Sequence, residues 1–316
     1  MNLFILAAGL GTRFKPLTLK MPKPTIPFLN VPMGYYNFRF LEKLNPMIKH
    51  FVVNTHHLPD QVEALYCNQK FISAQATFSK ETDEILGTAG GIKFAAPFFK
   101  ENGSIIVMNA DEIMFTENDD FMVDAVVQHN KNAALATLVV MKHPEAGKKF
   151  GAILCEGRSV KNISKTITDD KLEPWHYVGI IILSYEVLNL IEDGKEQNIF
   201  YDILINYLDR VQIFPIDAEW FETGNPTDFL KATDYVLNKL QQNPVDSKYR
   251  NVSDFINRVV PSDLIKTETS VSLVAKNLNL DFKKLTGFNV INSNVKIGHD
   301  DSVNNSVLFA DEKLTY

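Results

Sequence analysis

Short apolar runs alternate along the chain with segments whose apolar residues recur at helical spacing. The first run, residues 3–8, reads LFILAA and is typical of a short buried strand. Further runs that predict strands lie at residues 50–54, 76–79, 104–108, 133–141, 178–183 and 211–216. Segments that predict helices lie at residues 36–44, 58–66, 121–130, 198–208 and 227–240, and another begins near residue 92. Strands that alternate with helices predict an α/β fold in which crossover helices connect the strands of a sheet.

Two segments depart from this alternation. Residues 150–154 and 160–163 predict a hairpin, because the turn-forming sequence EGRS at residues 156–159 separates them. Residues 241–248, QQNPVDSK, are polar and predict a linker. We therefore expect a first domain at residues 1–240 and a linker with a C-terminal segment at residues 241–316.

Apolar residues in the C-terminal segment recur every six positions. They are Leu285, Ile291, Ile297, Val303 and Phe309. Neither a helix nor a simple strand has this period, whereas hexapeptide repeats produce it when three short strands complete each turn of a β-helix. At most about two turns fit, which is too few for a solenoid to be stable alone. We expect the segment to pack either on the first domain or on another subunit, and the second arrangement would make a homo-oligomer.

A cationic loop follows the first apolar run. Gly9 and Gly11 allow the backbone to turn and to approach a ligand closely. The loop then carries Thr12, Arg13, Lys15, Lys20 and Lys23, interleaved with Pro16, Pro22, Pro24 and Pro27. No Asp or Glu precedes Glu42. A stiff cationic loop after a buried strand predicts a polyphosphate site, because backbone N–H groups and fixed cations neutralise the anion.

Two other phosphate-binding motifs are absent from this loop. The dinucleotide fingerprint G-x-G-x-x-G would need a glycine at Phe14, and the prolines block the helix it should open. The P-loop pattern G-x-x-x-x-G-K-[ST] does not occur. A basic, proline-rich surface loop is the alternative, but it would leave the preceding strand and the missing acidic residues as coincidences.

Composition excludes several classes of function. The 316 residues carry 38 Asp and Glu against 32 Lys and Arg, which argues against a general nucleic-acid binder. Cys67 and Cys155 lie far apart, so neither a disulfide framework nor a zinc site is expected. The adjacent His56 and His57 have no further metal ligands at useful spacing. No secretory signal or apolar run of membrane-spanning length is present, so we expect a cytoplasmic protein without a membrane partner.

The loop motif resembles the signature of the sugar-1-phosphate nucleotidyltransferases, also called NDP-sugar pyrophosphorylases. The matching residues are Gly9-Leu10-Gly11-Thr12-Arg13-x-x-Pro16-x-Thr18-x-x-x-Pro22-Lys23-Pro24. The resemblance spans residues 3–240, and the tail at residues 294–309 resembles the left-handed β-helix tails of some members. It implies a Rossmann-like, doubly wound mixed sheet with the nucleotidyltransferase fold. It also implies that a nucleoside triphosphate and a sugar 1-phosphate react to give an NDP-sugar and pyrophosphate.

The resemblance assigns roles to individual residues. Arg13 would hold the leaving pyrophosphate, and Lys23 would stabilise the α-phosphate under attack. Residues expected to bind the nucleotide are Leu6, Ala8, Gly9, Gly11, Thr12, Arg13 and Lys23, together with Gly87 and Thr88 in the segment LGTAG. Residues expected to bind the sugar are Asn109, Gly151, Lys165, Tyr177 and Gly179.

Two carboxylates are expected to bind Mg²⁺. Asp111 in Asn109-Ala110-Asp111 matches the Asp of the family's N-G-D, with Ala110 in place of glycine. Glu222 stands in the motif W-x-D-x-G-x-P where the family has Asp. The Glu222 side chain is one methylene longer than that of Asp. It can still bind Mg²⁺ if its backbone lies slightly further from the ion. The alternative for Glu222 is an acidic residue at the start of the helix at 227–240.

Other departures from the family pattern leave alternatives open. Ser164-Lys165-Thr166 stands where many members have E-K-P, and Tyr177 stands where many have Asn. Ala110, Glu222 and the altered Ser164-Lys165-Thr166 leave a non-catalytic, nucleotide-sugar-sensing subunit open as an alternative. A choline-phosphate cytidylyltransferase would need an aromatic or acidic cage, for which Trp175 and Tyr177 are candidates. The sequence leaves the base, GTP or UTP, and the sugar open, since it resembles both mannose-1-phosphate guanylyltransferases and N-acetylmuramate-1-phosphate uridylyltransferases.

Overall fold

The computed structural model describes residues 1–276, 278–298, 301–310 and 312–316. The chain divides into two compact units. The first unit contains Met1–Leu10, Asn37–Ala110 and Asn118–Ala218, and the second contains Gly11–Tyr36, Asp111–Glu117 and Glu219–Tyr316. None of the helices in these described ranges combines the length and the apolar content needed to cross a bilayer.

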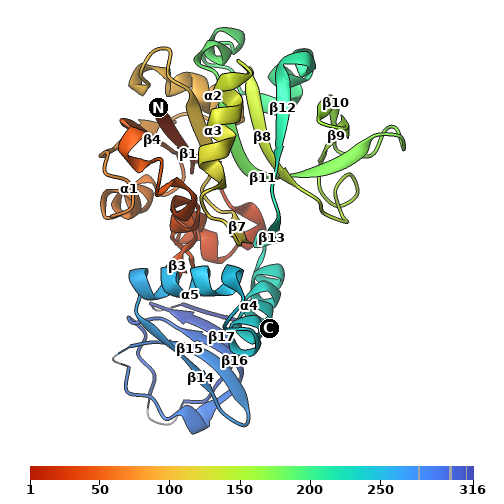
Figure 1. Ribbon diagram of the computed structural model, residues 1–316. Helices are drawn as coiled ribbons and strands as arrows, with labels where there is room; N and C mark the ends of the chain where they lie inside the picture. Colours follow the sequence, from red (N-terminus) through yellow and green to blue (C-terminus); the bar gives the residue numbers. More distant parts are fainter. Residues whose placement is uncertain (277, 299–300, 311) are drawn as a thin grey trace. The chain divides into compact units, whose positions relative to one another are not determined.

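A nine-stranded mixed sheet forms the centre of the first unit (Figure 1). Its order is β5 (Ala76–Lys80), β4 (His50–Thr55), β1 (Asn2–Leu6), β6 (Ile105–Asn109), β11 (Glu173–Leu183), β8 (Ala136–Met141), β12 (Val211–Pro215), β10 (Ser159–Ser164) and β9 (Ala152–Glu156). The first four are parallel to one another, and β11 is antiparallel to β6. In chain order, β1, β4, β5 and β6 occupy the third, second, first and fourth positions of the sheet, as in doubly wound folds. The order therefore reverses between β1 and β6, whose carboxyl ends are where such folds bind ligands.

Helices that connect the strands pack on this sheet. α1 (Pro59–Cys67) packs on β4 and β5, and α2 (Gly87–Phe94) packs on β1. α3 (Phe121–Lys131) packs on β8 and β11. Strand β1 has neighbours on both sides and is almost wholly buried, which explains why residues 3–6 are all apolar. The expected hairpin at residues 150–163 is confirmed by the antiparallel pairing of β9 with β10.

Three expected helices of the chain differ from the structure. α2 begins at Gly87 rather than near residue 92, so the glycine-rich segment is the first turn of the helix. The segment expected at 36–44 is a 3-10 helix, Met33–Leu41. The segment expected at 198–208 is a π-helical turn at Ile199–Ile203 followed by the 3-10 turn Leu204–Asn206. Apolar periodicity located all three segments, but it does not distinguish the helix types, which differ in backbone hydrogen bonding.

The second unit contains two long helices and a mixed sheet. α4 (Pro226–Gln242) and α5 (Ser247–Val259) follow each other closely, so only a short turn remains of the expected linker. The five-stranded sheet has the order β14 (Ser262–Lys266), β15 (Ser270–Ala275), β16 (Leu285–Ile291), β17 (Val303–Phe309) and β18 (Glu312–Thr315). The unit also holds the small pair β2 (Pro27–Phe28) and β3 (Val31–Pro32), and β7 (Ile113–Thr116), which pairs with β13 (Ala218–Phe221).

The C-terminal strands agree only in part with the expected repeats. β15, β16 and β17 are parallel, and the pairs Ser270↔Gly287 and Leu285↔Val303 give offsets of 17 and 18 residues, close to three six-residue steps. Ile291 belongs to the apolar core cluster of this sheet, and Ile297 packs against that cluster. β14 and β18, however, pair antiparallel with their neighbours. The described strands therefore form one mixed sheet, and they do not confirm a left-handed β-helix.

The last position of the six-residue period is shifted by one residue. Leu308, and not Phe309, joins the core cluster that contains Leu285 and Ile291. A register shift in the pairing of β16 with β17, between Thr286 and Asn289, explains this change. A one-residue shift moves a side chain to the other face of a strand.

Buried histidines make the stability of the first unit sensitive to acid. Burial lowers the pKa of His129 and of His176, each to about 4. Both titrate near pH 6.5 when unfolded, so the unfolded chain binds protons first as the pH falls. The native state is therefore favoured fully above about pH 6.5, and this contribution is lost as the pH falls toward 4. We expect the free energy of unfolding to fall by about 2 kcal/mol per histidine between pH 7.5 and pH 5.

Urea unfolding at these two pH values measures this loss. His129→Asn is a suitable variant because an amide atom replaces Nδ1, which lies 2.8 Å from Oγ1 of Thr137. Its pH-dependent loss should be smaller than that of the unsubstituted chain by about 2 kcal/mol. Equal losses in the two proteins would contradict the prediction.

Candidate functional site

The cationic loop of the second unit is built from three single 3-10 turns. They are Thr12–Phe14, Leu17–Leu19 and Lys23–Thr25, so the expected absence of an α-helix here is confirmed. Gly11 has φ +60°, and a Cβ there would lie 2.9 Å from Cγ2 of Thr18. The Thr18 hydroxyl donates to the Gly11 carbonyl at 2.9 Å. A glycine is therefore required at position 11, and the threonine fixes the turn that follows it.

Buried aromatic rings anchor this loop within the second unit. Phe14 is fully buried and packs edge-to-face on Phe229 of α4, with ring centroids 5.5 Å apart. Phe28 makes a similar contact with Phe229 at 5.5 Å. Aromatic pairs of this kind add about 0.5–1.5 kcal/mol each beyond area burial. The loop is therefore fixed before any ligand binds.

The C-terminal sheet also holds the region that follows the cationic loop. Asn30 has φ +69° and donates from Nδ2 to Oγ of Ser262 at 3.1 Å and to the carbonyl of Ile291 at 3.3 Å. Asn292 donates back to the Asn30 carbonyl at 3.2 Å. Within the loop itself, Lys20 forms an ion pair with Glu312 at 2.7 Å. The tail therefore contacts the loop region directly.

Lys23 and Asp111 form the closest ion pair of the candidate site. Nζ of Lys23 lies 2.6 Å from Oδ2 of Asp111, and the side chains are 10% and 36% exposed. A buried ammonium requires a partner, because removing it from water is costly. The loop offers no acidic residue, so the partner comes from the segment that follows β6.

Arg13 and Glu222 form a second, looser ion pair. Nη1 of Arg13 lies 3.8 Å from Oε1 of Glu222, and the guanidinium is largely exposed. The same carboxylate oxygen accepts from the Gly224 amide at 2.7 Å. A Cβ on Gly224 would lie 2.3 Å from this oxygen and 2.6 Å from Nη2 of Arg13. A larger residue at position 224 would displace one or both of these side chain ends.

The second unit brings the two predicted metal ligands onto neighbouring segments. The hydroxyl of Thr223, next to Glu222, donates to the Asp111 carbonyl at 3.4 Å. Nε1 of Trp220 donates to Oε2 of Glu112 at 2.7 Å. Glu112 is therefore hydrogen bonded to the strand that precedes Glu222.

The donor set fits Mg²⁺ shared with substrate phosphates rather than a closed metal cage. Among the residues that the structure describes, no group of three or more His, Cys, Asp and Glu side chains could hold an ion. Two carboxylates with space for phosphate oxygens and water are the usual protein contribution to such an ion. Asp111 and Glu222 supply the two carboxylates, and each is held by a cation of the loop.

Other residues predicted to bind the nucleotide lie in the first unit. Leu6 ends β1, and the Ala110 amide donates to its carbonyl at 3.1 Å. Gly87 has φ +69°, and a Cβ there would lie 2.7 Å from the Gln197 carbonyl. The Thr88 hydroxyl accepts from the Ile199 amide at 2.8 Å. Close contact with the segment around residue 198 explains why glycine starts α2.

Part of the predicted sugar-binding set lines a cavity of about 150 Å³ in the first unit. Its lining residues are Gly151, Ala152, Ile153, Ile163, His176, Tyr177, Phe200 and Tyr201. Lys165 lies near it, with Nζ 6.0 Å from the centroid of the Tyr201 ring. Gly179 has φ +79°, and the Asn109 carbonyl accepts from Nδ2 of Asn37 at 2.9 Å; neither residue lines the cavity. His176 is uncharged near neutral pH, because burial lowers its pKa to about 4.

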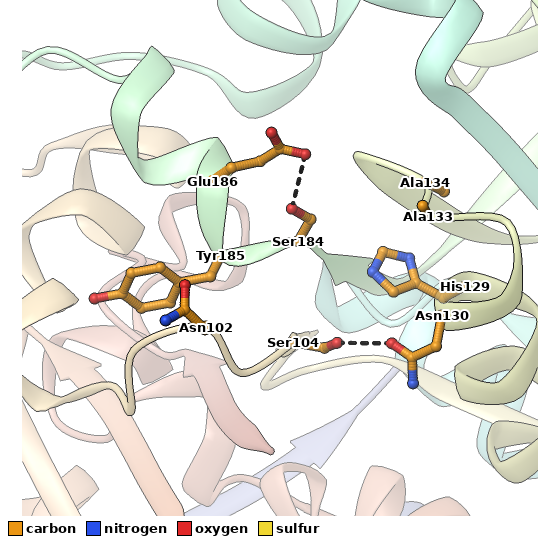
Figure 2. A pocket seen from close by; sticks show the side chains of 9 residues that line it. All are labelled: Asn102, Ser104, His129, Asn130, Ala133, Ala134, Ser184, Tyr185 and Glu186. Carbon is orange, nitrogen blue, oxygen red and sulfur yellow. Dashed lines mark hydrogen bonds between the residues drawn. The ribbon is translucent and has the colours of Figure 1, made fainter.

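A second cavity in the first unit contains none of the predicted site residues. It has a volume of about 260 Å³ and lies beside Ser104, at the amino end of β6 (Figure 2). Its polar side chains bond to one another: Ser104 donates to Asn130 at 3.0 Å, and Ser184 donates to Glu186 at 3.1 Å. Nucleotides bind at carboxyl ends in folds of this kind, so this cavity is not the expected site.

Two buried polar residues of the first unit were not predicted from the sequence. Asn54 of β4 and Glu81, just after β5, are hydrogen bonded to each other and to backbone amides beside Leu6 and Gly87. A signal for Asn54 was present in the sequence, since this polar residue directly follows the apolar run at residues 51–53.

Comparison with known proteins extends these observations. A sequence model of the nucleotidyl transferase family matches residues 3–239. Mannose-1-phosphate guanyltransferase of Saccharomyces cerevisiae is 33% identical over 245 residues, which cover 75% of this chain and 64% of that protein. UTP–glucose-1-phosphate uridylyltransferase of Synechocystis is 27% identical over 334 residues, which cover 99% of this chain and 84% of that protein. The match thus spans less than two thirds of the yeast protein's length.

Solved structures share the fold at lower identity. UDP-glucose pyrophosphorylase from Acinetobacter baumanii aligns with a TM-score of 0.62 and 16% identity, covering 81% of this chain and 98% of that chain. The inositol-1-phosphate CTP transferase of T. maritima aligns with a TM-score of 0.60 and 17% identity, covering 77% and 96%. These structures establish a mixed α/β nucleotidyltransferase-type fold. Because the family model covers more than half of the chain, this protein belongs to the nucleotidyl transferase family.

Proposed function

We propose that this chain joins a nucleoside triphosphate to a sugar 1-phosphate, giving an NDP-sugar and pyrophosphate. The observation that carries the proposal is the 2.6 Å contact between Lys23 of the acid-free loop and Asp111. It joins a fixed cation and a metal-ligating carboxylate, the two kinds of group that phosphoryl chemistry requires. The names of the yeast and Synechocystis relatives support the same reaction class.

The reaction would proceed by direct in-line displacement. A phosphate oxygen of the sugar 1-phosphate attacks the α-phosphorus, and the bond from that phosphorus to the bridging oxygen of pyrophosphate breaks. No protein base is required, because a phosphate monoester is already largely ionised at neutral pH. Catalysis then consists of positioning and charge stabilisation.

Side chains of the second unit would supply the charge stabilisation. Lys23 would stabilise the α-phosphate, and Arg13 would hold the departing pyrophosphate. Mg²⁺ held by Asp111 and Glu222 would neutralise phosphate charge when it is bound. The two carboxylates pair with the same two cations, and these contacts hold the four side chains in place.

Residues of the first unit would bind the base and the sugar. Gly87 and Thr88 would lie against the nucleoside, and Gly151, Lys165, Tyr177 and Gly179, with Asn109, would contact the sugar phosphate. The cavity lined by Tyr177 has aliphatic and aromatic walls, which suits the C–H face of a sugar ring. GTP and UTP are the candidate nucleotides.

One observation bears on the alternative functions. Nζ of Lys142 lies 3.6 Å from the centroid of the Trp175 ring, so a lysine already occupies the face that a choline cage would need. A non-catalytic, nucleotide-sugar-sensing subunit is the remaining alternative, because Glu222 replaces the family's Asp. Pyrophosphate release with a panel of sugar phosphates distinguishes it from the enzyme.

The C-terminal segment and the location of the protein stay predictions. The division into a catalytic domain at 1–240 and an appended segment at 241–316 is supported by the family match at residues 3–239. Offsets of 17 and 18 residues in the parallel strands support a short left-handed β-helix of hexapeptide repeats.

A homo-oligomer formed through this segment is tested by the molar mass in solution of the chain and of a chain truncated after Lys283. We also propose that the protein is located in the cytoplasm.

Replacement of Lys23 tests the proposed chemistry. We expect Lys23→Ala to lower kcat by about 10²–10³, because one preorganised charge-stabilising donor is lost. Lys49→Ala is the control, since Lys49 carries the same charge, is exposed and lies outside the cationic loop. The rate of pyrophosphate release measures kcat for both variants. Turnover of Lys23→Ala within threefold of the unsubstituted chain would exclude the assigned role.

Replacement of the two carboxylates tests the metal site. Asp111→Asn and Glu222→Gln keep the side-chain shape but remove a charged ligand, so activity should be lost at low Mg²⁺. Glu222→Asp should also weaken the use of Mg²⁺, because the arm is shorter by about 1.5 Å and metal sites tolerate only about 0.2 Å. The exposed Glu268→Gln is the control. If Glu222→Gln is fully active at limiting Mg²⁺, Glu222 is not a ligand and the sensor alternative gains support.

A further inference from the structure

A buried amide and a buried carboxylate connect two backbone segments of the first unit. Asn54 is 2% exposed and Glu81 is 3% exposed. Nδ2 of Asn54 donates to Oε1 of Glu81 at 2.6 Å. The two side chains meet because β4 and β5 are neighbouring parallel strands and both residues lie at the carboxyl ends of their strands.

The remaining polar atoms of this pair bind the backbone. Oδ1 of Asn54 accepts from the amides of Ala7 and Ala8, at 2.7 and 3.3 Å. Oε2 of Glu81 accepts from the amide of Leu86 at 2.9 Å. These donors fix the orientation of the Asn54 amide, since its oxygen must face the two N–H groups. A continuous chain of hydrogen bonds thus runs from the end of β1 to the residue before α2.

The bridge, as we call the pair Asn54 and Glu81, has properties that a simple packing contact would not need. A carboxylate buried among neutral donors costs desolvation free energy, which an apolar pair would avoid. Glu81 uses both of its oxygens as acceptors, which an amide at the same position cannot do. A Cβ on Gly91 of α2 would lie 2.9 Å from Oε1 of Glu81 and 3.0 Å from Nδ2 of Asn54. The helix therefore packs directly on the bridge.

We infer that Asn54 and Glu81 are positioning residues for nucleotide binding. They hold residues 6–9 at a fixed distance from residues 86–88, the two segments of the first unit expected to bind the nucleoside triphosphate. The inference rests on the proposed function. Misplacement of a binding group by about 1 Å can cost about a hundredfold in rate, so a bridge that fixes this spacing has a direct effect on the reaction.

A single substitution breaks the donor pattern while keeping the shape. In Glu81→Gln, the new amide has one acceptor, which can serve either Asn54 or Leu86, and its NH₂ group then faces another donor. Loss of one buried hydrogen bond of this kind predicts a Kd for GTP or UTP raised about ten- to hundredfold. The KM for the sugar phosphate should change by less than about threefold. Glu84→Gln, an exposed acid of the same loop, is the matched control and should leave both constants unchanged.

A double variant reverses the direction of the central hydrogen bond. In Asn54→Asp/Glu81→Gln, the carboxylate at position 54 accepts from Ala7, Ala8 and the new amide at position 81. The oxygen of that amide accepts from Leu86. All the bonds are restored with the net charge unchanged, so nucleotide affinity should return to within about threefold of the unsubstituted chain. Isothermal titration with GTP and UTP, with Tm measured in parallel, reports the result.

The outcomes separate positioning from a purely structural role. If Glu81→Gln lowers Tm but binds the triphosphate with unchanged Kd, the inference is wrong. It is also wrong if the double variant binds no better than the single one. Should the unsubstituted chain bind no triphosphate, the proposed function fails instead. The bridge is then tested alone by amide hydrogen exchange at Ala7, Ala8 and Leu86, which Glu81→Gln must accelerate if the bridge holds these segments.

Discussion

The ion pair between Lys23 and Asp111 is the interaction on which the candidate site depends. Its lysine is almost buried, and its carboxylate belongs to a segment 88 residues further along the chain. An isolated buried ammonium would be strongly destabilised, so the loop and the segment after β6 must fold against each other. The same pairing fixes the positions of the cation and the carboxylate that the proposed chemistry requires. The stability of the fold and the proposed chemistry therefore both require that Lys23 and Asp111 lie close together.

Other contacts of the second unit serve to keep this pair fixed. Phe14 and Phe28 bury the loop against Phe229 of α4, and Asn30 binds the C-terminal sheet. The tail thus contributes to the rigidity of the loop region, in addition to any part in assembly. A preorganised site loses little free energy to reorganisation when the ligand binds, which is the main advantage of a stiff, proline-rich loop.

In the first unit, hydrogen bonds rather than ion pairs fix the spacing between the end of β1 and the start of α2. Asn54 and Glu81 connect the end of β1 to the start of α2 through neutral amide donors. Parallel strands bring their carboxyl ends to one edge of the sheet, and this topology gathers polar side chains that lie far apart in the sequence. Within the first unit, such hydrogen bonds fix the geometry of residues 6–8 and 86 through neutral backbone amides.

The sequence alone determined the features that depend on neighbouring residues. Strand β1, the glycine turn and the cationic loop follow from an apolar run, two glycines and the absence of acids before Glu42, all within a short stretch. The position of Asp111 after a buried strand was predictable for the same reason. Tertiary structure decided the start of α2 at Gly87, the one-residue shift that places Leu308 in the core, and the bridge between Asn54 and Glu81. These features depend on which strands and segments become neighbours. Local periodicity carries no information about such long-range pairing, because the hydrogen bonds that fix it join residues far apart in the chain.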